Sequence, residues 1–486
     1  MGTLHQIRNE DNRFDSSSRD RLATALCVAL RRAVDADVGP GASFEDREVA
    51  TLKVANAATR ANLEVDLQAI ADGQSRELLV NGVPYRAHEP GSATYHSLSG
   101  ALVVTRATYR KAASKDRQTV VPLELQAGIV ERATPALGKC IGLGYAKGHM
   151  RGLEEDLHAS HRLPPSRSTL ERMATSIGMR AHREAVRIEA HVRRSEEIPV
   201  GACAISLGLD RTAVPMEELR PEDAEPTTAR KKRVTPYVRQ QMPAVDVHYR
   251  MAYVGTVSFL DANADVLVTR RYVASAKEGP VYILHRMLLD VRHARKTSTT
   301  VLPILVVQDG APELWNIMRS GLEAEKVEAW HEAIDRFHLM EHLAAALSLI
   351  EDDPAARKLK LATWSKELDA DDGAIDRIRA FFSDVQIELS TSQTEKLDEQ
   401  RTYLENNHDR MRYATLRAKG LPVGSGATEG ACKSVVNVRA KRSGQRWHDE
   451  GLTASLTLRA IYLSERLHAF WTHLAATYRA EIRAAA

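Results

Sequence analysis

The sequence has few cysteines, and they lie far apart. The four are Cys27, Cys140, Cys203 and Cys432, and no two form a CxxC pair. This pattern supports neither a zinc ribbon nor a disulfide framework. A reducing compartment fits such free thiols, and we expect a cytoplasmic protein.

Long apolar runs and a strong net charge are also missing. No run approaches the roughly 18 residues that would span a bilayer, so we expect no membrane partner. The start, "MGTLHQIRNEDNRFDSS", lacks the apolar core of a signal peptide. The 67 Lys and Arg nearly balance the 64 Asp and Glu, for a net charge of +3. A nucleic-acid surface would therefore have to come from local basic clusters.

The 486 residues, 43% hydrophobic and 27% charged, have an ordinary globular composition. Such a length predicts about two to four domains. Residues 1–75 read as a helical arm for dimerisation or DNA contact, with two helices within 17–72. Residues 76–121 predict a small β module, because an Asn81-Gly82 turn and further strand-like runs follow one another there.

Residues 122–198 are expected to be helical again. A Pro-Pro turn precedes a helix whose apolar residues share one face and whose arginines lie elsewhere: Leu170, Met173 and Ile177 against Arg167, Arg172 and Arg180. This is the pattern of a helix-turn-helix, with the last helix as the DNA reader and Arg167 and Arg172 as DNA contacts. An ordinary helical hairpin is the alternative.

From Cys203 onward the pattern becomes α/β. "CAISLGLD" predicts a buried strand ending in Asp210, and "VDVHYRMAYVGTVSFLDANADVLVTRRYV" predicts two strands joined by a turn. A helix, "GPVYILHRMLLDVRHARK", and a strand ending in Asp309, "TVLPILVVQDG", follow. This order is that of an RNase H-like fold. Between the first two strands lies a mobile-looking insertion, where Arg230–Arg233 are either phosphate contacts or a solvated charge run.

The predicted fold class is thus multidomain α+β with an RNase H-like catalytic domain. Its parts follow the β module and the helix-turn-helix-like segment: 199–342 as the first part of the catalytic core, 343–420 as a helical insertion, and 421–486 as the final helices with a basic run.

Acids at strand ends suggest chemistry. Adjacent strands would bring Asp210 and Asp309 side by side, and a helix beginning at Glu429 could deliver a third carboxylate. Three carboxylates form a cage for two Mg²⁺ or Mn²⁺ ions, which can drive phosphodiester cleavage. Each acid taken alone is also consistent with a turn residue or helix cap.

Five blocks between about residues 122 and 475 extend this pattern: "GLGYAKGHMRGLEEDLHASHRLPPSRSTLERMA", "SLGLDRTAVPMEE", "VVQDGAPELWN", "DRFHLMEHL" and "PVGSGATEGACKSVVNVRAKRSGQRW". Together they resemble the DDE transposases of the ISKra group of bacterial insertion sequences. The resemblance implies Asp210, Asp309 and Glu429 as the metal-binding triad, with His338 near the active site. Arg211 departs from the small residue expected after the first acid, which keeps Asp246 and Asp261 as alternatives.

The last block carries one acid followed by a basic run. The small residues of "GSGAT" allow a turn into the helix of Glu429, and five basic residues follow it as expected contacts to the DNA backbone: Lys433, Arg439, Lys441, Arg442 and Arg446. "GSGATEG" is one residue too long for a dinucleotide fingerprint, and it lacks the Gly-Lys-Ser/Thr of a P-loop. A glycine turn before a solvated basic helix is the simpler alternative.

A rival site is "HLMEH", residues 338–342, which matches the HxxEH pattern of inverted zinc peptidases. The resemblance instead predicts a bacterial transposase that is nucleoid-associated when bound to DNA. It would bind the terminal inverted repeats of its element as a homodimer or higher oligomer, and would cleave and join DNA. A catalytically inactive DNA-binding regulator and a structure-specific nuclease of the same fold remain alternatives.

Overall fold

The computed structural model describes residues 16–111, 119–219, 245–384, 389–479 and 482–484. The chain forms two compact units, one of residues 1–144, 149–173 and 475–486 and the other of 145–148 and 174–474. Both helices and sheets are present, so the predicted multidomain α+β class is confirmed at that level. Among the described helices, none has the length and apolar character needed to cross a membrane.

The first unit begins with two helices, α1 (Ser16–Asp37) and α2 (Phe44–Asp72), as the sequence predicts. Six short strands follow in the described part of the chain: β1 (Glu77–Val80), β2 (Val83–Ala87), β3 (Gly91–Ser97), β4 (Gly100–Arg106), β5 (Tyr109–Lys111) and β6 (Thr119–Val120). Strand β12 (Ile482–Ala484), the last element of the chain order, joins them. They form a sheet in the order β12-β1-β2-β5-β6 and a separate β3-β4 hairpin.

The β1-β2 hairpin confirms the predicted Asn-Gly turn. Asn81 and Gly82 have φ values of 51° and 79°, as a tight two-residue hairpin turn requires. The sequence places residues 421–486 entirely in the catalytic core. In the structure, β12 at the end of this range instead pairs with β1. Three residues are too few for a periodic pattern that the sequence could reveal.

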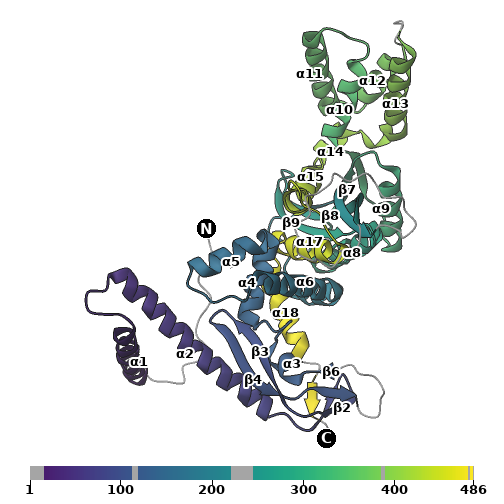
Figure 1. Cartoon of the computed structure of the whole chain (residues 1–486). Helices are drawn as coiled ribbons and strands as arrows, with labels where there is room; N and C mark the ends of the chain where they lie inside the picture. Colours follow the sequence, from purple (N-terminus) through teal and green to yellow (C-terminus); the bar gives the residue numbers. More distant parts are fainter. Residues whose placement is uncertain (1–15, 112–118, 220–244, 385–388, 480–481, 485–486) are drawn as a thin grey trace. The chain divides into compact units, whose positions relative to one another are not determined.

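Helix α2 is part of the core of the first unit. Its Leu67 packs with Tyr95 of β3 and Leu102 of β4, and Figure 1 shows α2 running alongside this hairpin. The C-terminal part of α2 covers one face of the β3-β4 hairpin, whereas its role in dimerisation or DNA contact stays a prediction.

A helical segment follows the strands: α3 (Pro122–Ala127), α4 (Pro135–Lys147), α5 (Met150–Ala159), α6 (Arg167–Arg183) and α7 (Ala185–Ser195). The boundary between the two units falls within α4 and α6. Leu170, Met173 and Ile177 are fully buried, which confirms the predicted apolar face of α6.

The second unit contains a mixed sheet in the order β11-β10-β7-β8-β9. Its strands are β7 (Ala204–Leu219), β8 (Val245–Leu260), β9 (Val266–Ala274), β10 (Ile304–Gln308) and β11 (His331–Ile334). Strands β7, β8 and β9 are antiparallel neighbours, whereas β10 runs parallel to β7 and β11 parallel to β10.

Two of these strands differ from the prediction. Strand β7 does not end at Asp210 but continues to Leu219, because β8 pairs with it along its whole length. Strand β11 was not predicted, since its four residues, "HEAI", carry no clear alternation. The predicted insertion with Arg230–Arg233 lies in residues 220–244, outside the described residues.

Helices cover both faces of this sheet. One face packs against α8 (Gly279–Thr297) and α9 (Pro312–Ala324). The other face packs against a continuous helix with three parts: α15 (Gly426–Ala431), a π-helical stretch (Cys432–Asn437) and α16 (Val438–Ala440). The next helix, α17 (Asp449–Leu463), packs on the same face. Helix α18 (Leu467–Arg479) follows. Tyr272 and Val273 of β9 illustrate the alternation, because each belongs to the core on a different face.

The predicted helical insertion is present beyond β11, where Figure 1 shows its helices gathered in a bundle at one end of the sheet. Its elements are α10 (Arg336–Leu347), α11 (Pro354–Ala370), α12 (Ala374–Ser383), α13 (Thr391–Asn407), a 3₁₀ turn (His408–Arg410) and α14 (Tyr413–Ala418). Trp364, Phe382 and Leu397 belong to the same apolar core as the sheet and α8, so the insertion and the sheet share one core.

Candidate active site

Asp210 lies within β7, and Asp309 directly follows the neighbouring parallel strand β10. Val306 of β10 pairs with Leu207 of β7, and the two acids lie three residues further along each chain. The charge of Asp309 helps to raise the pKa of Asp210, which indicates that the two carboxylates are close. The structure thus brings together the first two acids that the sequence predicts.

Asp210 is half-buried, and burial is the main reason that its pKa is raised. Two donors partly oppose this shift: the Arg211 amide at 2.6 Å and the Cys432 thiol at 3.2 Å. Burial and the charge of Asp210 raise the pKa of the Cys432 thiol, so this thiol stays protonated and able to donate. The Arg211 side chain points elsewhere and pairs with Glu313 of α9.

Asp309 closes the turn between β10 and α9. Its Oδ1 accepts a hydrogen bond from the Ala311 amide at 3.0 Å, and its carbonyl accepts one from Trp315 Nε1 at 2.7 Å. The bond from the Ala311 amide makes Asp309 a turn residue, which is the alternative that the sequence allows for each acid. The second oxygen is free of any such bond within the described residues, so the turn role leaves acceptor capacity for a further ligand.

Asp335 joins two elements of the site and was not singled out from the sequence. It caps α10 by accepting from the Phe337 and His338 amides at 2.6 and 3.2 Å. It also accepts from the amide of Ser425 at 2.6 Å and from its hydroxyl. Asp335 is only 2% exposed; burial favours its neutral form, but the bonds from His338 and Ser425 hold its pKa well below the usual range. The acid before a helix was a visible N-cap signal, but its long-range partner was not.

His338, which the resemblance places near the active site, is close enough to Asp210 and Asp309 for their charges to influence one another. Its Nδ1 is 3.8 Å from the Asp335 carboxylate, which raises the pKa of His338 to about 9. The charge of Asp309 contributes in the same direction. His338 is therefore a cation at neutral pH, and its charge interacts with those of Asp335, Asp309 and Asp210.

The helix that carries Glu429 is docked closely on the sheet. A Cβ at Gly208 of β7 would lie 1.8 Å from Thr428 Oγ1, so only glycine allows this approach. The Thr428 hydroxyl also shares a 2.7 Å hydrogen bond with Thr256 of β8. The helix begins at Gly426, three residues before the predicted Glu429 start.

The Glu429 side chain itself does not join the other two acids. It is 40% exposed and pairs with Lys433, one turn further along the helix, at 2.5 Å. Within the described residues, no group of three or more His, Cys, Asp or Glu side chains is close enough to hold a metal ion. Lys433, expected to contact DNA, neutralises Glu429 in this structure.

The rest of the basic run is divided between core and surface. Arg439 is 3% exposed and its guanidinium lies over the rings of Tyr145 and Trp447 at 5.1 and 4.7 Å. Burial lowers the pKa of Arg439 to about 10. Its assignment as a surface DNA contact is therefore corrected. The sequence does not show that Arg439 is buried while the neighbouring basic residues are exposed. The π-helical stretch just before it changes which side chains of the helix face the core.

Besides Lys433, three basic residues of the run are exposed. Lys441 donates to the Thr212 hydroxyl, the Arg442 Nε donates to the Val438 carbonyl at 2.9 Å, and Arg446 Nη1 lies 3.7 Å from Glu217. In the first unit, Arg167 pairs with Glu154 at 2.9 Å, and Arg172 is exposed on α6.

The rival residues have other structural roles. His342 shares a 2.6 Å hydrogen bond with Gln400 and stacks on Tyr403 with 3.5 Å between ring centroids, so it packs against α13. Asp261 closes the β8-β9 turn by accepting from two amides. Asp246 stands opposite Glu218, at the end of the β7-β8 pair remote from the β8-β9 turn.

Comparison with known proteins adds no identity to this geometry. No model of a known protein family matches the chain, and no curated protein matches it.

Proposed function

We propose that this chain is a DDE-type DNA transposase whose second unit is an RNase H-like catalytic domain. The observation that carries the proposal is the pair of acids Asp210, within β7, and Asp309, directly after β10; each lies three residues beyond the paired residues Leu207 and Val306 of these parallel strands. The order of elements along the chain supports it. Three antiparallel strands (β7, β8, β9) are followed by helix α8, and then by the parallel strands β10 and β11, with α9 between them. That is the order expected of an RNase H-like domain.

Asp210 and Asp309 would hold divalent cations, Mg²⁺ or Mn²⁺, because such hard ions prefer carboxylate oxygens. Glu429 would complete the set after its side chain leaves Lys433, so the described residues fit such a centre in part. Two ions bound there would activate a water or a 3′-hydroxyl and stabilise the leaving oxygen of a phosphodiester.

The residues around the acids fit a DNA substrate. His338, as a cation, would contact the scissile phosphate, and the exposed Lys441 and Arg442 would contact neighbouring phosphates. Such contacts add affinity that falls with salt and read no sequence. Base reading would fall to α6 with Arg172, and the protein would act on the ends of its element as a homodimer or higher oligomer.

The test is Mg²⁺-dependent cleavage and strand transfer on DNA that carries the sequences flanking the gene. We compare the wild type with Glu429→Gln, and with Glu450→Gln as a matched control on the exposed start of α17. We expect cleavage by the wild type and by Glu450→Gln only, with DNA binding retained in all three. Full activity of Glu429→Gln would overturn the assignment.

A second candidate is a DNA-binding regulator derived from such an enzyme. It is favoured by the ion pair between Glu429 and Lys433, which leaves the third acid away from the other two. Specific binding of the flanking DNA without cleavage by the wild type, in Mg²⁺ or Mn²⁺, would select this candidate.

A further inference from the structure

A basic pocket lies in the first unit between α2 and the connection from α5 to α6. Its volume is about 300 Å³, and its lining comes from one face of α2 and from the connection: Lys53, Asn56, Ala57 and Arg60 with His158, His161, Arg162 and Leu163. We propose that this pocket binds a phosphate group of the DNA backbone. The proposal rests on the proposed function and assigns a DNA contact outside the catalytic unit.

The pocket is held together by a buried polar contact. Asn56 is 5% exposed, and its Nδ2 donates to the His161 carbonyl at 2.7 Å. This bond fixes the connection against α2 at a residue whose φ is 53°, in the left-handed region. The Arg60 guanidinium is positioned beside Gly100, where a Cβ would lie 3.4 Å from its Nη1. The basic groups therefore stand on a fixed frame.

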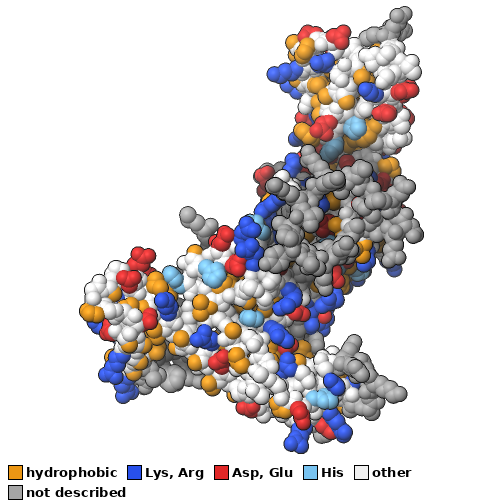
Figure 2. Space-filling view, viewed as in Figure 1, with side chains coloured by type: hydrophobic (Ala, Val, Ile, Leu, Met, Phe, Trp, Pro, Cys, Tyr) orange, Lys and Arg blue, Asp and Glu red, His pale blue; other side chains and the backbone are white. Residues whose placement is uncertain are grey.

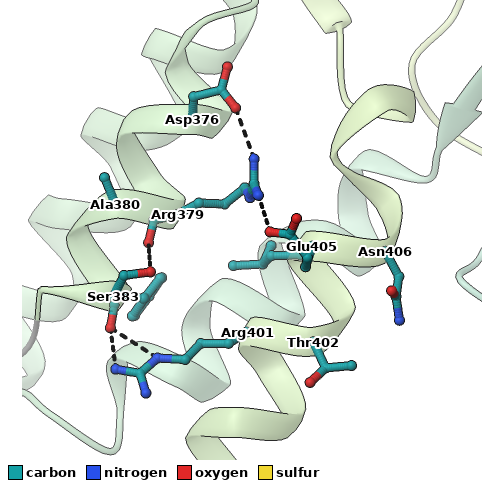
Figure 3. Close-up of a pocket in the computed structure, with 10 residues that line it drawn as sticks. Asp376, Arg379, Ala380, Ser383, Arg401, Thr402, Glu405 and Asn406 are labelled. Atoms are coloured by element: carbon teal, nitrogen blue, oxygen red, sulfur yellow. Dashed lines mark hydrogen bonds and ion pairs between the residues drawn. The ribbon is translucent and has the colours of Figure 1, made fainter.

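The cations of the pocket have no acidic partner. None of the lining residues is acidic, and within the described chain no ion pair involves Lys53, Arg60 or Arg162. The insertion offers a contrast, because in its pocket of about 500 Å³ Arg379 lies between Asp376 and Glu405 (Figure 3).

Cations without an acidic partner around a pocket match the chemistry of phosphate. Arg and Lys donate charge-assisted hydrogen bonds to phosphate oxygens. Asn56, which holds the connection to α2, is uncharged and adds no negative charge to the pocket. On the face seen in Figure 2, Lys and Arg are interleaved with Asp and Glu over much of the surface. The lining of this pocket, by contrast, includes basic residues and no acidic one. Lys53, His158 and Arg162 are exposed, which suits an extended polymer better than an enclosed small ion.

Ala57 offers a test that removes no contact. Ala57→Glu places a carboxylate among the cations, and Ala57→Gln adds the same bulk without charge; Ala57 is exposed on α2, and both residues are good helix formers. The probe is a random-sequence DNA duplex of about 30 base pairs, because phosphate contacts do not depend on sequence. We expect Ala57→Glu to weaken binding about tenfold at low salt and Ala57→Gln to bind as the wild type. Equal binding by all three proteins, or an equal loss in both variants, would overturn the proposal.

A double variant measures the number of phosphate contacts. Lys53→Ala with Arg60→Ala should reduce the slope of log affinity against log salt by about 1.8, or roughly 0.9 per lost contact. The matched control is Arg110→Ala with Lys111→Ala, which removes the same charge from exposed positions of β5 in the same unit. An equal reduction of this slope in the control would overturn the proposal, because the loss of any two positive charges from this unit would then explain the effect.

The two proposals fail in different ways. A wild type that binds no duplex would overturn the DNA-based function and the pocket together. A wild type that binds and cleaves DNA, with every pocket variant doing the same, would overturn the pocket alone. If Ala57→Glu weakens the binding of inorganic phosphate but not of the duplex, the site is one for a free anion, which also overturns the proposal.

Discussion

Thr428 of α15 lies against Gly208 of β7 so closely that a Cβ at position 208 would come within 1.8 Å of its hydroxyl. Gly208 is two residues before Asp210, and Thr428 is the residue before Glu429. The contact therefore sets how the helix of the third acid approaches the strand of the first.

Gly208→Ala should destabilise the protein by about 1 to 3 kcal/mol, because the added methyl group overpacks this contact. Gly430→Ala is the matched control, since a Cβ there meets nothing within 4 Å and the position is helical. The free energy of unfolding in urea measures both changes. Equal stability of the two variants would show that the contact is not tight.

Asp335→Ala should cost about 3 kcal/mol of unfolding free energy, because it removes a helix cap and the bonds to Ser425 together. Asp353→Ala removes a cap alone, at the start of α11, and should cost about 1 kcal/mol. Urea unfolding again gives the comparison. Similar losses would mean that the link to Ser425 contributes nothing.

The contribution of His338 to stability should depend on pH. The Asp335 carboxylate raises the pKa of His338 from 6.5 to about 9, so the protonated form favours the folded state. The stabilisation is complete below pH 6.5 and is lost as pH rises through about 9. The difference in Tm between the wild type and His338→Gln should therefore shrink between about pH 6 and pH 10. A difference that stays constant over this range would contradict the interaction with Asp335.

Arg439 and Arg442 should respond differently to the same substitution. Arg439→Ala removes a buried cation from two aromatic rings and should cost about 2 kcal/mol or more. Arg442→Ala removes an exposed side chain, so stability should change by no more than about 0.5 kcal/mol. Under the proposed function, Arg442→Ala should also weaken DNA binding and reduce its salt dependence. Thermal unfolding and DNA titration of both variants separate the two roles.

Local patterns predict much of this structure. The Asn81-Gly82 hairpin, the apolar face of α6 and the buried strand before Asp309 depend on neighbouring residues, which the sequence displays directly. The predicted proximity of Asp210 and Asp309 follows from the parallel pairing of the strand segments just before them, although β7 continues past Asp210.

Contacts between distant segments could not be predicted in this way. The bond from Ser425 to Asp335, the packing of Thr428 on Gly208 and the pairing of β12 with β1 join segments far apart in the chain. Arg439 was misassigned for the same reason, since its partner Tyr145 lies almost three hundred residues earlier. A basic residue among other basic residues is expected to be exposed, because the sequence does not display its distant aromatic partners.

The proposed role of Asp210 and Asp309 as the core of a DNA-cleaving site predicts that cleavage depends on the Asp210 carboxylate. We would measure the single-turnover rate of Mg²⁺-dependent cleavage of the flanking DNA for Asp210→Asn and for Asp261→Asn, whose carboxylate only closes a turn. Asp210→Asn should lose more than roughly 100-fold in rate, since even outer partners of metal ligands are worth 10- to 100-fold. Asp261→Asn should keep the wild-type rate. Undiminished cleavage by Asp210→Asn, or a loss confined to Asp261→Asn, would contradict the account.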